Sequence, residues 1–224
     1  MNTKMIVFDM AGTTVDEDNV VYKTLHGAIQ KAGINVSLEQ VLVEGAGKEK
    51  LNAIHDILTF LDIQDVEVIS PVIHRDFLIQ LDEAYLTLDV KGMPHAEDVF
   101  FKLRERGILV VLNTGYNRQI ANQLLDKIGW KISEHYDLLV TATDVTNCRP
   151  FPDMIQFAID YFGGIDSSTI IKVGDSTVDI EEGINAKCLY SIGITSGAQT
   201  RAQLETAHPE FIINDLIELL DIVN

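Results

Sequence analysis

The stretch MIVFDMAGTTVD, residues 5–16, indicates both the fold of this 224-residue chain and the position of its functional site. Residues 5–8 form an apolar run of the length of a buried strand, and Asp9 follows it directly. Ligands collect at the carboxyl ends of strands in open parallel sheets, so a carboxylate here is well placed to react. Gly12 and Thr13 come next, and the backbone N–H groups of such a segment can hold phosphate oxygens. An Asp that simply ends a strand at a tight turn is the structural alternative.

Four further apolar runs have the length of buried strands. They cover residues 108–112, 138–141, 169–173 and 189–194. Helical patterns separate most of them and end near glycines, where helices commonly terminate; these are Gly107, Gly129 and Gly163. Strands that alternate with helices of about three turns predict an α/β fold with a doubly wound parallel sheet.

Between residues 8 and 108 the sequence carries helical patterns and almost no strand signal. Ser37 and Gln40 have the spacing of a capping box, and Ser70-Pro71 has the composition of a helix start. We therefore expect a helical lobe over residues 18–90, inserted into a core made of residues 1–17 and 91–224. Such an insertion, directly after a catalytic strand, is more often a lid over the site than added bulk.

Composition excludes several classes of partner. The net charge of −17 argues against a nucleic acid or an anionic lipid surface, because both require a basic face. No stretch approaches the roughly 18 apolar residues that span a membrane. The N-terminal MNTK leads into the first strand without a signal-peptide pattern, so we expect a cytoplasmic protein. Cys148 and Cys188 lack a CxxC spacing, which favours reduced thiols. A homodimer is compatible with the sequence, which does not determine the assembly.

Two other segments place polar groups where an anion could bind. In LNTGYN, residues 112–117, Thr114 ends a strand, and its hydroxyl can donate a hydrogen bond to an anion beside a helix N-terminus. In CRPFP, residues 148–152, prolines fix the loop that carries Arg149, whose charge can neutralise a carboxylate and a phosphoryl group together. The structural alternatives are an N-cap for Thr114 and a surface position for Arg149.

The segment KVGDSTVD, residues 172–179, again predicts a strand, a glycine turn and a helix. Asp175 and Asp179 are four residues apart, at the strand exit and in the first helical turn, so they can face one cavity. Hard oxygen ligands of this kind suit Mg²⁺, which takes few carboxylates together with substrate phosphate and water. Acidic residues that merely complement the helix dipole are the alternative.

Taken in this order, the motifs resemble those of the haloacid-dehalogenase superfamily over nearly the whole chain, including a helical cap between the first two motifs. The resemblance implies a Rossmann-like core, Mg²⁺ as cofactor and catalysis through an aspartyl intermediate, with Asp9 as nucleophile. It implies that Thr114 and Arg149 stabilise the transferred phosphoryl group. The implied metal ligands are Asp9, the Ala11 carbonyl, Asp175 and, in support, Asp179. The candidate substrate-binding residues are Gly12, Thr13, Gly115, Tyr116 and Lys48.

One position departs from the usual pattern. Most phosphatases of this superfamily carry an acid two residues after the nucleophile, which protonates the leaving alcohol; here that position is Ala11. General acid help is typically worth about 10²–10⁴-fold in rate. The sequence DMAGTTVD resembles the phosphonatase-like branch, in which phosphonoacetaldehyde hydrolase forms a Schiff base through a cap lysine. Lys48 occupies the matching place, but Glu44 and Leu51 stand where that enzyme has Met and His. Lys48 therefore either reacts in this way, binds an anionic group of the substrate or caps the following helix.

The sequence supports a Mg²⁺-dependent hydrolase that cleaves a small-molecule phosphonate or phosphate ester through an aspartyl phosphate on Asp9. A 2-haloacid dehalogenase would use the same nucleophile, but it needs no metal, and the pair Asp175 and Asp179 counts against it. A non-hydrolytic binding or regulatory protein is the third reading. The retained nucleophile argues against that reading, since a binding protein has no need of one.

Overall fold

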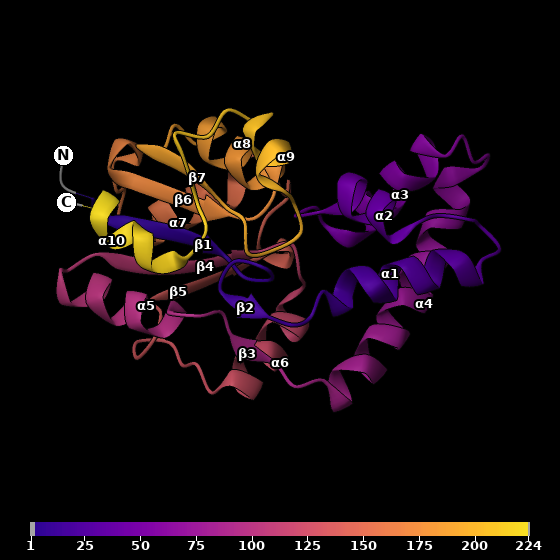
Figure 1. Cartoon of the computed structure of the whole chain (residues 1–224), viewed down its shortest axis with the longest axis horizontal. Helices are drawn as coiled ribbons and strands as arrows, with labels where there is room; N and C mark the ends of the chain where they lie inside the picture. The colour runs from indigo at the N-terminus through magenta and orange to yellow at the C-terminus, as the bar shows by residue number, and fades with distance from the viewer. Residues whose placement is uncertain (1–2, 224) are drawn as a thin grey trace.

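The computed structural model describes residues 3–223, and a six-stranded sheet in the order β5-β4-β1-β6-β7-β8 forms its centre (Figure 1). All neighbouring pairs are parallel. The strands are β1 Met5–Asp9, β4 Leu109–Thr114, β5 Leu138–Thr141, β6 Ile170–Gly174, β7 Tyr190–Ile194 and β8 Phe211–Ile213. The parallel α/β fold and the five predicted strands are confirmed. The short edge strand β8 was not predicted, because its three residues give too little pattern.

The order of the strands determines which loops meet. β1 lies between β4 and β6, with Asp9 opposite Asn113 and Val7 opposite Lys172. The carboxyl ends of these three central strands are therefore adjacent. Asp9 and Thr114 are the last residues of β1 and β4, and Asp175 directly follows β6. The predicted catalytic motifs thus share one edge of the sheet.

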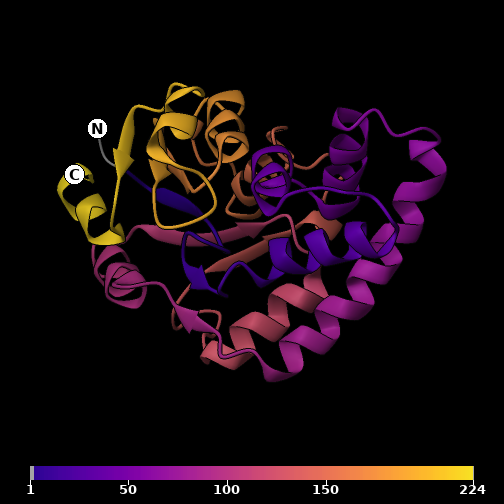
Figure 2. The same cartoon turned by 45° about the vertical axis from the view of Figure 1, so that its right-hand side comes forward.

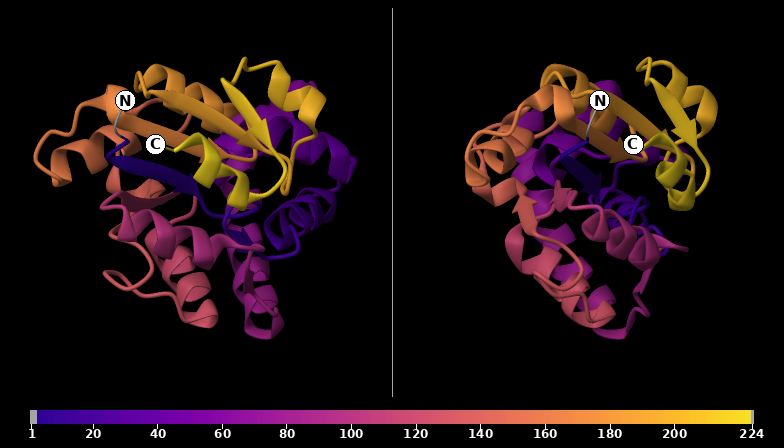
Figure 3. Two further views of the ribbon diagram at one scale, coloured as in Figure 1. Left: turned by 60° about the vertical axis from the view of Figure 1, so that its left-hand side comes forward. Right: turned by 90° about the vertical axis from the view of Figure 1, so that its left-hand side faces the viewer.

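Helices cover both faces of the sheet (Figure 3). They are α5 Ala96–Glu105, α6 Arg118–Ile128, α7 Asp153–Tyr161, α8 Thr177–Asn185, α9 Arg201–Glu205 and α10 Leu219–Ile222. Alternate residues of β1 enter separate hydrophobic clusters, as the period of two in a strand requires. Phe8 packs edge-on against Phe100 of α5, with ring centroids 5.3 Å apart, whereas Val7 shares a cluster with Met154 of α7. Both faces of the sheet are therefore buried, which explains why its strands read as continuous apolar runs.

Four helices occupy the interval in which the sequence predicts a helical lobe: α1 Val20–Lys31, α2 Leu38–Gly45, α3 Lys50–Phe60 and α4 Val66–Thr87. They pack on one another beyond the carboxyl ends of the strands (Figures 1 and 2). Two short strands, β2 Val15–Asp16 and β3 Lys91–Gly92, pair antiparallel where the chain enters and leaves this group. The capping box of Ser37 and Gln40 is confirmed at the start of α2.

The expected helix start at Ser70-Pro71 is wrong. Helix α4 begins at Val66, so Pro71 lies inside it. A proline there removes one backbone hydrogen bond and disfavours the preceding turn, at a cost of about 3 kcal/mol in a helix interior. Val66 and Ile69 pack against the hydrophobic core, and this burial outweighs the proline.

Two expectations concern the chain as a whole. Cys148 and Cys188 are free thiols, as expected. Within residues 3–223, no helix combines the length and the apolar character that crossing a bilayer requires.

Candidate active site

Three buried carboxyl groups meet at the carboxyl edge of the sheet. Asp9 ends β1, Asp175 follows β6 and Asp179 lies in the first turn of α8. One oxygen of each lies within 4.8 Å of the others. Glycine permits this approach: a Cβ on Gly12 would come 2.4 Å from Asp175 Oδ2, and one on Gly174 would come 2.2 Å from the Asp179 Cβ. The small residues in both motifs are therefore needed to bring the carboxylates together.

Arg149 lies in the middle of this cluster and is buried with it. Its Nη1 is 2.6 Å from Asp9 Oδ1 and 3.0 Å from Asp179 Oδ1. Its Nη2 donates to the backbone oxygen and Oδ1 of Asn113, at 2.9 and 2.7 Å. The structure thus rules out the surface alternative for Arg149 and places its charge on the expected nucleophile.

Two charged residues close to Arg149, Lys172 and Glu182, were not predicted as part of the site. The Lys172 ammonium lies 2.9 Å from Asp179 Oδ1 and 3.4 Å from Glu182 Oε2, and Arg149 Nε lies 3.2 Å from the same Glu182 oxygen. Lys172 is fully buried in β6. The sequence did contain a sign of this role: Lys172 is the single charged residue of an apolar strand, and a buried lysine requires a carboxylate or another polar partner.

Charge counting indicates what this cluster can bind. The four buried carboxyl groups are Asp9, Asp175, Asp179 and Glu182, and the two cations that contact them are Arg149 and Lys172. Two negative charges are left without a partner if all six groups are ionised. A divalent cation with oxygen ligands would balance them, and Mg²⁺ fits a donor set of this kind. The residues present therefore fit the metal that the sequence predicts.

The pKa values follow the same arrangement. Burial, together with the neighbouring Asp9 and Asp179, raises the pKa of Asp175 well above its ordinary value. The pKa of Asp9 is also raised, again mainly by burial. Burial acts on Asp179 in the same direction, but Arg149 and Lys172 outweigh it and hold the pKa of Asp179 below its ordinary value. A cation beside Asp175 would offset the repulsion that raises its pKa.

A narrow cavity lies beside Asp9. The residues that line it are Asp9, Ala11, Tyr22, Gly47, Lys50, Thr114, Gly115, Tyr116 and Arg149. Its volume is ≈ 10 Å³, about that required by one water molecule. Gly12 and Thr13 lie in the turn after β1, where Thr13 is buried and its hydroxyl has no hydrogen-bond partner within the described chain. The cavity thus joins most of the predicted catalytic and phosphate-binding residues.

Lys48 and Lys50 occupy different surroundings. The Lys48 ammonium lies 2.6 Å from Asp56 Oδ2, and Lys48 is not among the residues that line the cavity. Lys50 does line it, and its buried ammonium lies 5.3 Å from the ring centre of Tyr22 and 5.8 Å from that of Tyr116. The structure therefore directs Lys50, rather than the predicted Lys48, towards Asp9.

The start of helix α3 causes this difference. Glu49 is the N-cap, and its carboxylate accepts hydrogen bonds from the N–H groups of Leu51 and Asn52. Lys48 thus precedes the helix and does not cap it, whereas Lys50 is the first residue of the helix. The sequence alone could not fix that start.

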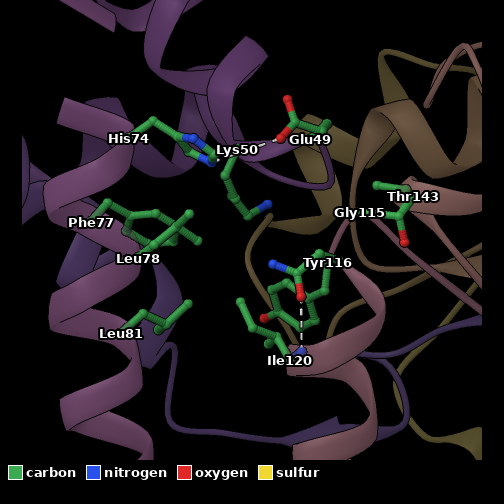
Figure 4. Close-up of a pocket in the computed structure, with 12 residues that line it drawn as sticks. Glu49, Lys50, His74, Phe77, Leu78, Leu81, Gly115, Tyr116, Ile120 and Thr143 are labelled. Atoms are coloured by element: carbon green, nitrogen blue, oxygen red, sulfur yellow. Dashed lines mark hydrogen bonds and ion pairs between the residues drawn. The ribbon is translucent and has the colours of Figure 1, made fainter. Parts of the chain in front are cut away.

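A second cavity, of ≈ 290 Å³, neighbours the first, and Figure 4 draws the residues that line it. Phe77, Leu78 and Leu81 of α4 line one side, and Tyr116 and Ile120 line the other. The Lys50 side chain extends between the two walls. Lys50, Gly115 and Tyr116 border both cavities. This second space is mainly apolar and lies where the organic part of a ligand would extend from Asp9.

The loop between α2 and α3 closes directly over the core. A Cβ on Gly47 would come 2.2 Å from Ser176 Oγ, and one on Gly115 would come 3.0 Å from the Lys48 backbone oxygen. The Gly47 N–H donates to the Tyr22 hydroxyl at 3.1 Å. The site is therefore built from both the sheet edge and the four-helix group, with glycines where the two surfaces touch.

The chain is similar to several known proteins. A family profile described as haloacid dehalogenase-like hydrolase matches residues 3–187. A bifunctional phosphonoacetaldehyde hydrolase/aminoethylphosphonate transaminase of Clostridioides difficile is 29% identical over 211 residues, which are 87% of this chain and 32% of that relative. The chain thus spans about a third of that protein.

Two further matches extend over whole chains. Pyrophosphatase PpaX of Oceanobacillus iheyensis is 25% identical over 224 residues, with 100% of this chain and 98% of the relative covered. The crystal structure of a phosphonoacetaldehyde hydrolase-like protein from Oleispira antarctica superimposes with a TM-score of 0.85. It is 22% identical, with 100% of this chain and 92% of that chain covered. The structural match supports the fold.

Proposed function

Since the chain belongs to the haloacid dehalogenase-like hydrolase family, we propose that it is a Mg²⁺-dependent phosphohydrolase acting on a small phosphonate or phosphate ester. The observation that carries the proposal is the buried cluster of Asp9, Asp175 and Asp179, with Arg149 bound to Asp9. Relatives named phosphonoacetaldehyde hydrolase and pyrophosphatase support a phosphorus-containing substrate. The two negative charges left over in the cluster favour a divalent metal.

In the proposed reaction an oxygen of Asp9 attacks phosphorus, and the ester oxygen of a phosphate ester, or the carbon of a phosphonate, leaves with the electron pair of the broken bond, so that an aspartyl phosphate forms. Arg149 and Thr114, both at the cavity, would stabilise charge on the phosphoryl oxygens. Asp9, Asp175, Asp179 and the Ala11 carbonyl would hold Mg²⁺, which supplies Lewis-acid stabilisation of the same oxygens. Water then cleaves the aspartyl phosphate and frees Asp9.

We further propose that the four helices over residues 18–90 act as a cap that selects the substrate. This proposal is supported by Gly47 and Lys50, which belong to this part of the chain and line the cavity beside Asp9. Closure of such a lobe would exclude bulk water and protect the covalent intermediate from side reactions. The larger apolar cavity would receive the organic part of the substrate.

The test is hydrolysis of p-nitrophenyl phosphate, whose aryl leaving group needs little protonation. We expect turnover that depends on Mg²⁺ and is removed by chelation. Asp9→Asn should lower kcat by roughly 10³-fold or more, because the amide cannot serve as the nucleophile. Circular dichroism of the variant controls for folding. Undiminished turnover by folded Asp9→Asn protein, or turnover without a divalent metal, would contradict the proposal.

A further inference from the structure

Within the described chain, the cavity beside Asp9 lacks a second carboxylic acid that could protonate a leaving oxygen, but a lysine ammonium lines it. Ala11 stands where most phosphatases of the superfamily have the acid for the leaving oxygen, and Ala11 lines the cavity. Lys50 lines the same cavity from the opposite lobe. Building on the phosphohydrolase function proposed above, we propose that the Lys50 ammonium donates a proton to the leaving oxygen, in place of the missing carboxyl group.

The position of Lys50 suits this role. A substrate whose phosphoryl group meets Asp9 and whose organic part enters the larger cavity must pass the side chains that border both spaces. These are Gly115, Tyr116 and Lys50, and Lys50 alone among them carries an ammonium (Figure 4). The bond that breaks joins the phosphoryl group to the organic part. Its leaving oxygen would therefore lie near the Lys50 ammonium.

The other proton donors at the cavity are less suitable. The Arg149 guanidinium is held by Asp9, Asn113 and Glu182, and arginine does not lose its proton in proteins. Burial raises the pKa values of Tyr22 and Tyr116 well above that of an ordinary phenol. Lys50 has no carboxylate within 4 Å of its ammonium among residues 3–223, and one N–H donates to the Lys48 backbone oxygen at 2.5 Å. Its other protons can point into the cavity.

The surroundings of Lys50 also tune its acidity in a useful direction. Burial lowers the pKa of Lys50 to about 8, against the opposing effect of the neighbouring carboxylates. An acid with a pKa near the working pH transfers protons efficiently in both directions. The charged or titratable groups around the ammonium are Asp9, Glu17, Tyr22, Glu49, His74, Tyr116 and Arg149.

Atoms and charges balance in both half-reactions. In the first, Asp9 Oδ forms a bond to phosphorus, the P–O bond to the organic group breaks, and its electron pair stays on the leaving oxygen. That oxygen takes one proton from the Lys50 ammonium, which becomes a neutral amine. In the second, the amine takes a proton from water as the water oxygen attacks phosphorus. The electron pair of the P–O bond then returns to Asp9, and the ammonium is restored.

The experiment compares two leaving groups in the parent chain and in Lys50→Met, a variant of similar shape without the charge. We expect kcat for 2-phenylethyl phosphate to fall by about 10²–10⁴-fold, the usual worth of a general acid. For p-nitrophenyl phosphate the fall should stay below about tenfold, because that leaving group needs little protonation. Added methylamine should restore part of the alkyl phosphate turnover. Thermal unfolding of each variant verifies folding.

Lys48→Met provides the matched comparison, since it removes the same charge two residues away. We expect its ratio of alkyl to aryl turnover to stay close to that of the parent. In the parent, alkyl phosphate turnover should fall as the pH rises through about 8, when Lys50 loses its proton, and Lys50→Met should lack that decline.

Several results would overturn the inference. An equal loss on both substrates in Lys50→Met would mean that Lys50 only binds the substrate. Selective loss in Lys48→Met, or no alkyl phosphate turnover by the parent, would exclude Lys50 as the acid. Borohydride trapping of Lys50 during phosphonoacetaldehyde turnover would show that the amine reacts as a nucleophile instead. Aryl phosphate turnover that depends on Asp9 and Mg²⁺ would still stand in each case, so the proposed function is tested separately.

Discussion

Glu17 lies just before helix α1, and its carboxyl group is almost completely buried. Its Oε2 accepts a hydrogen bond from the Val21 N–H at 3.1 Å, inside the first turn of the helix. Burial nevertheless raises the pKa of Glu17 to about 8, although this hydrogen bond and Lys50 act in the opposite direction. At neutral pH the folded chain therefore holds a protonated glutamic acid beside the catalytic lysine that we propose.

If Glu17 is protonated in the folded chain, replacement by Gln should change how the free energy of unfolding depends on pH. The folded-state pKa lies above the unfolded one, so the parent loses stability as the pH rises from about 4.5 to about 8. The loss amounts to roughly 1.4 kcal/mol for each pH unit in this window. Glu17→Gln has no carboxyl group to titrate and therefore escapes this loss. Its free energy of unfolding should be close to that of the parent near pH 4.5 and should exceed it by a growing margin towards pH 8. Urea unfolding across this pH range measures the difference, and a constant difference would refute a raised pKa for Glu17.

At the scale of elements, the loop between α2 and α3 controls how closely the helical lobe approaches the core. Gly47 has a φ of +70°, and a Cβ there would collide with Ser176 Oγ. Gly33, after α1, has a φ of +84° with no atom within 4 Å of its Cβ position. Alanine at either position brings similar backbone strain, about 1 kcal/mol. Only at Gly47 does it also push the lobe away from the core.

Gly47→Ala should therefore lower kcat/KM by roughly 10–100-fold, because Lys50 and the larger cavity move relative to Asp9. Gly33→Ala should lose a similar amount of stability and keep its kcat/KM. Steady-state kinetics on 2-phenylethyl phosphate and thermal unfolding of both variants make the comparison. Equal kinetic effects in the two variants would indicate that strain alone, rather than contact between lobe and core, is responsible.

At the scale of the whole molecule, the negative charge of the site should make the stability of the fold depend on a bound divalent cation. The chain carries 34 acidic against 17 basic residues, and its site concentrates four buried carboxyl groups around two cations. A ligand that binds only the folded state stabilises it in proportion to the logarithm of its concentration. A divalent cation at the carboxylate cluster should therefore raise the stability of the entire fold.

We expect Mg²⁺ at about 100 times its Kd to raise the free energy of unfolding by roughly 2.7 kcal/mol, or the Tm by about 5–10 °C. Asp175→Asn should lose most of this increase, since it removes one charged ligand. NaCl at equal ionic strength controls for general screening of the acidic surface. A Tm increase of the same size in Asp175→Asn would place the stabilising cation elsewhere on the chain.

The parallel α/β fold could be predicted because each strand, turn and helix has its own local pattern. The same local patterns indicated Asp9, Thr114 and Asp175, since each lies one or two residues after an apolar run that becomes a central strand. Strand β8 and the pair β2–β3 were missed because two or three residues carry no readable period. The start of α4 was misplaced because packing of Val66 and Ile69 outweighs the local preference of Pro71.

The sequence by itself thus determined the sheet, the order of the motifs and the acidic residues at the strand ends, since all of these depend on neighbours within a few positions. Tertiary structure alone decided which charges pair: Arg149 meets Asp9 across 140 residues, and Lys172 meets Glu182 from a different element. It also decided that Lys50 enters the cavity while Lys48 pairs with Asp56. The physical reason is that a buried charge takes its partner from whatever the fold brings within about 4 Å, and sequence spacing does not contain that distance.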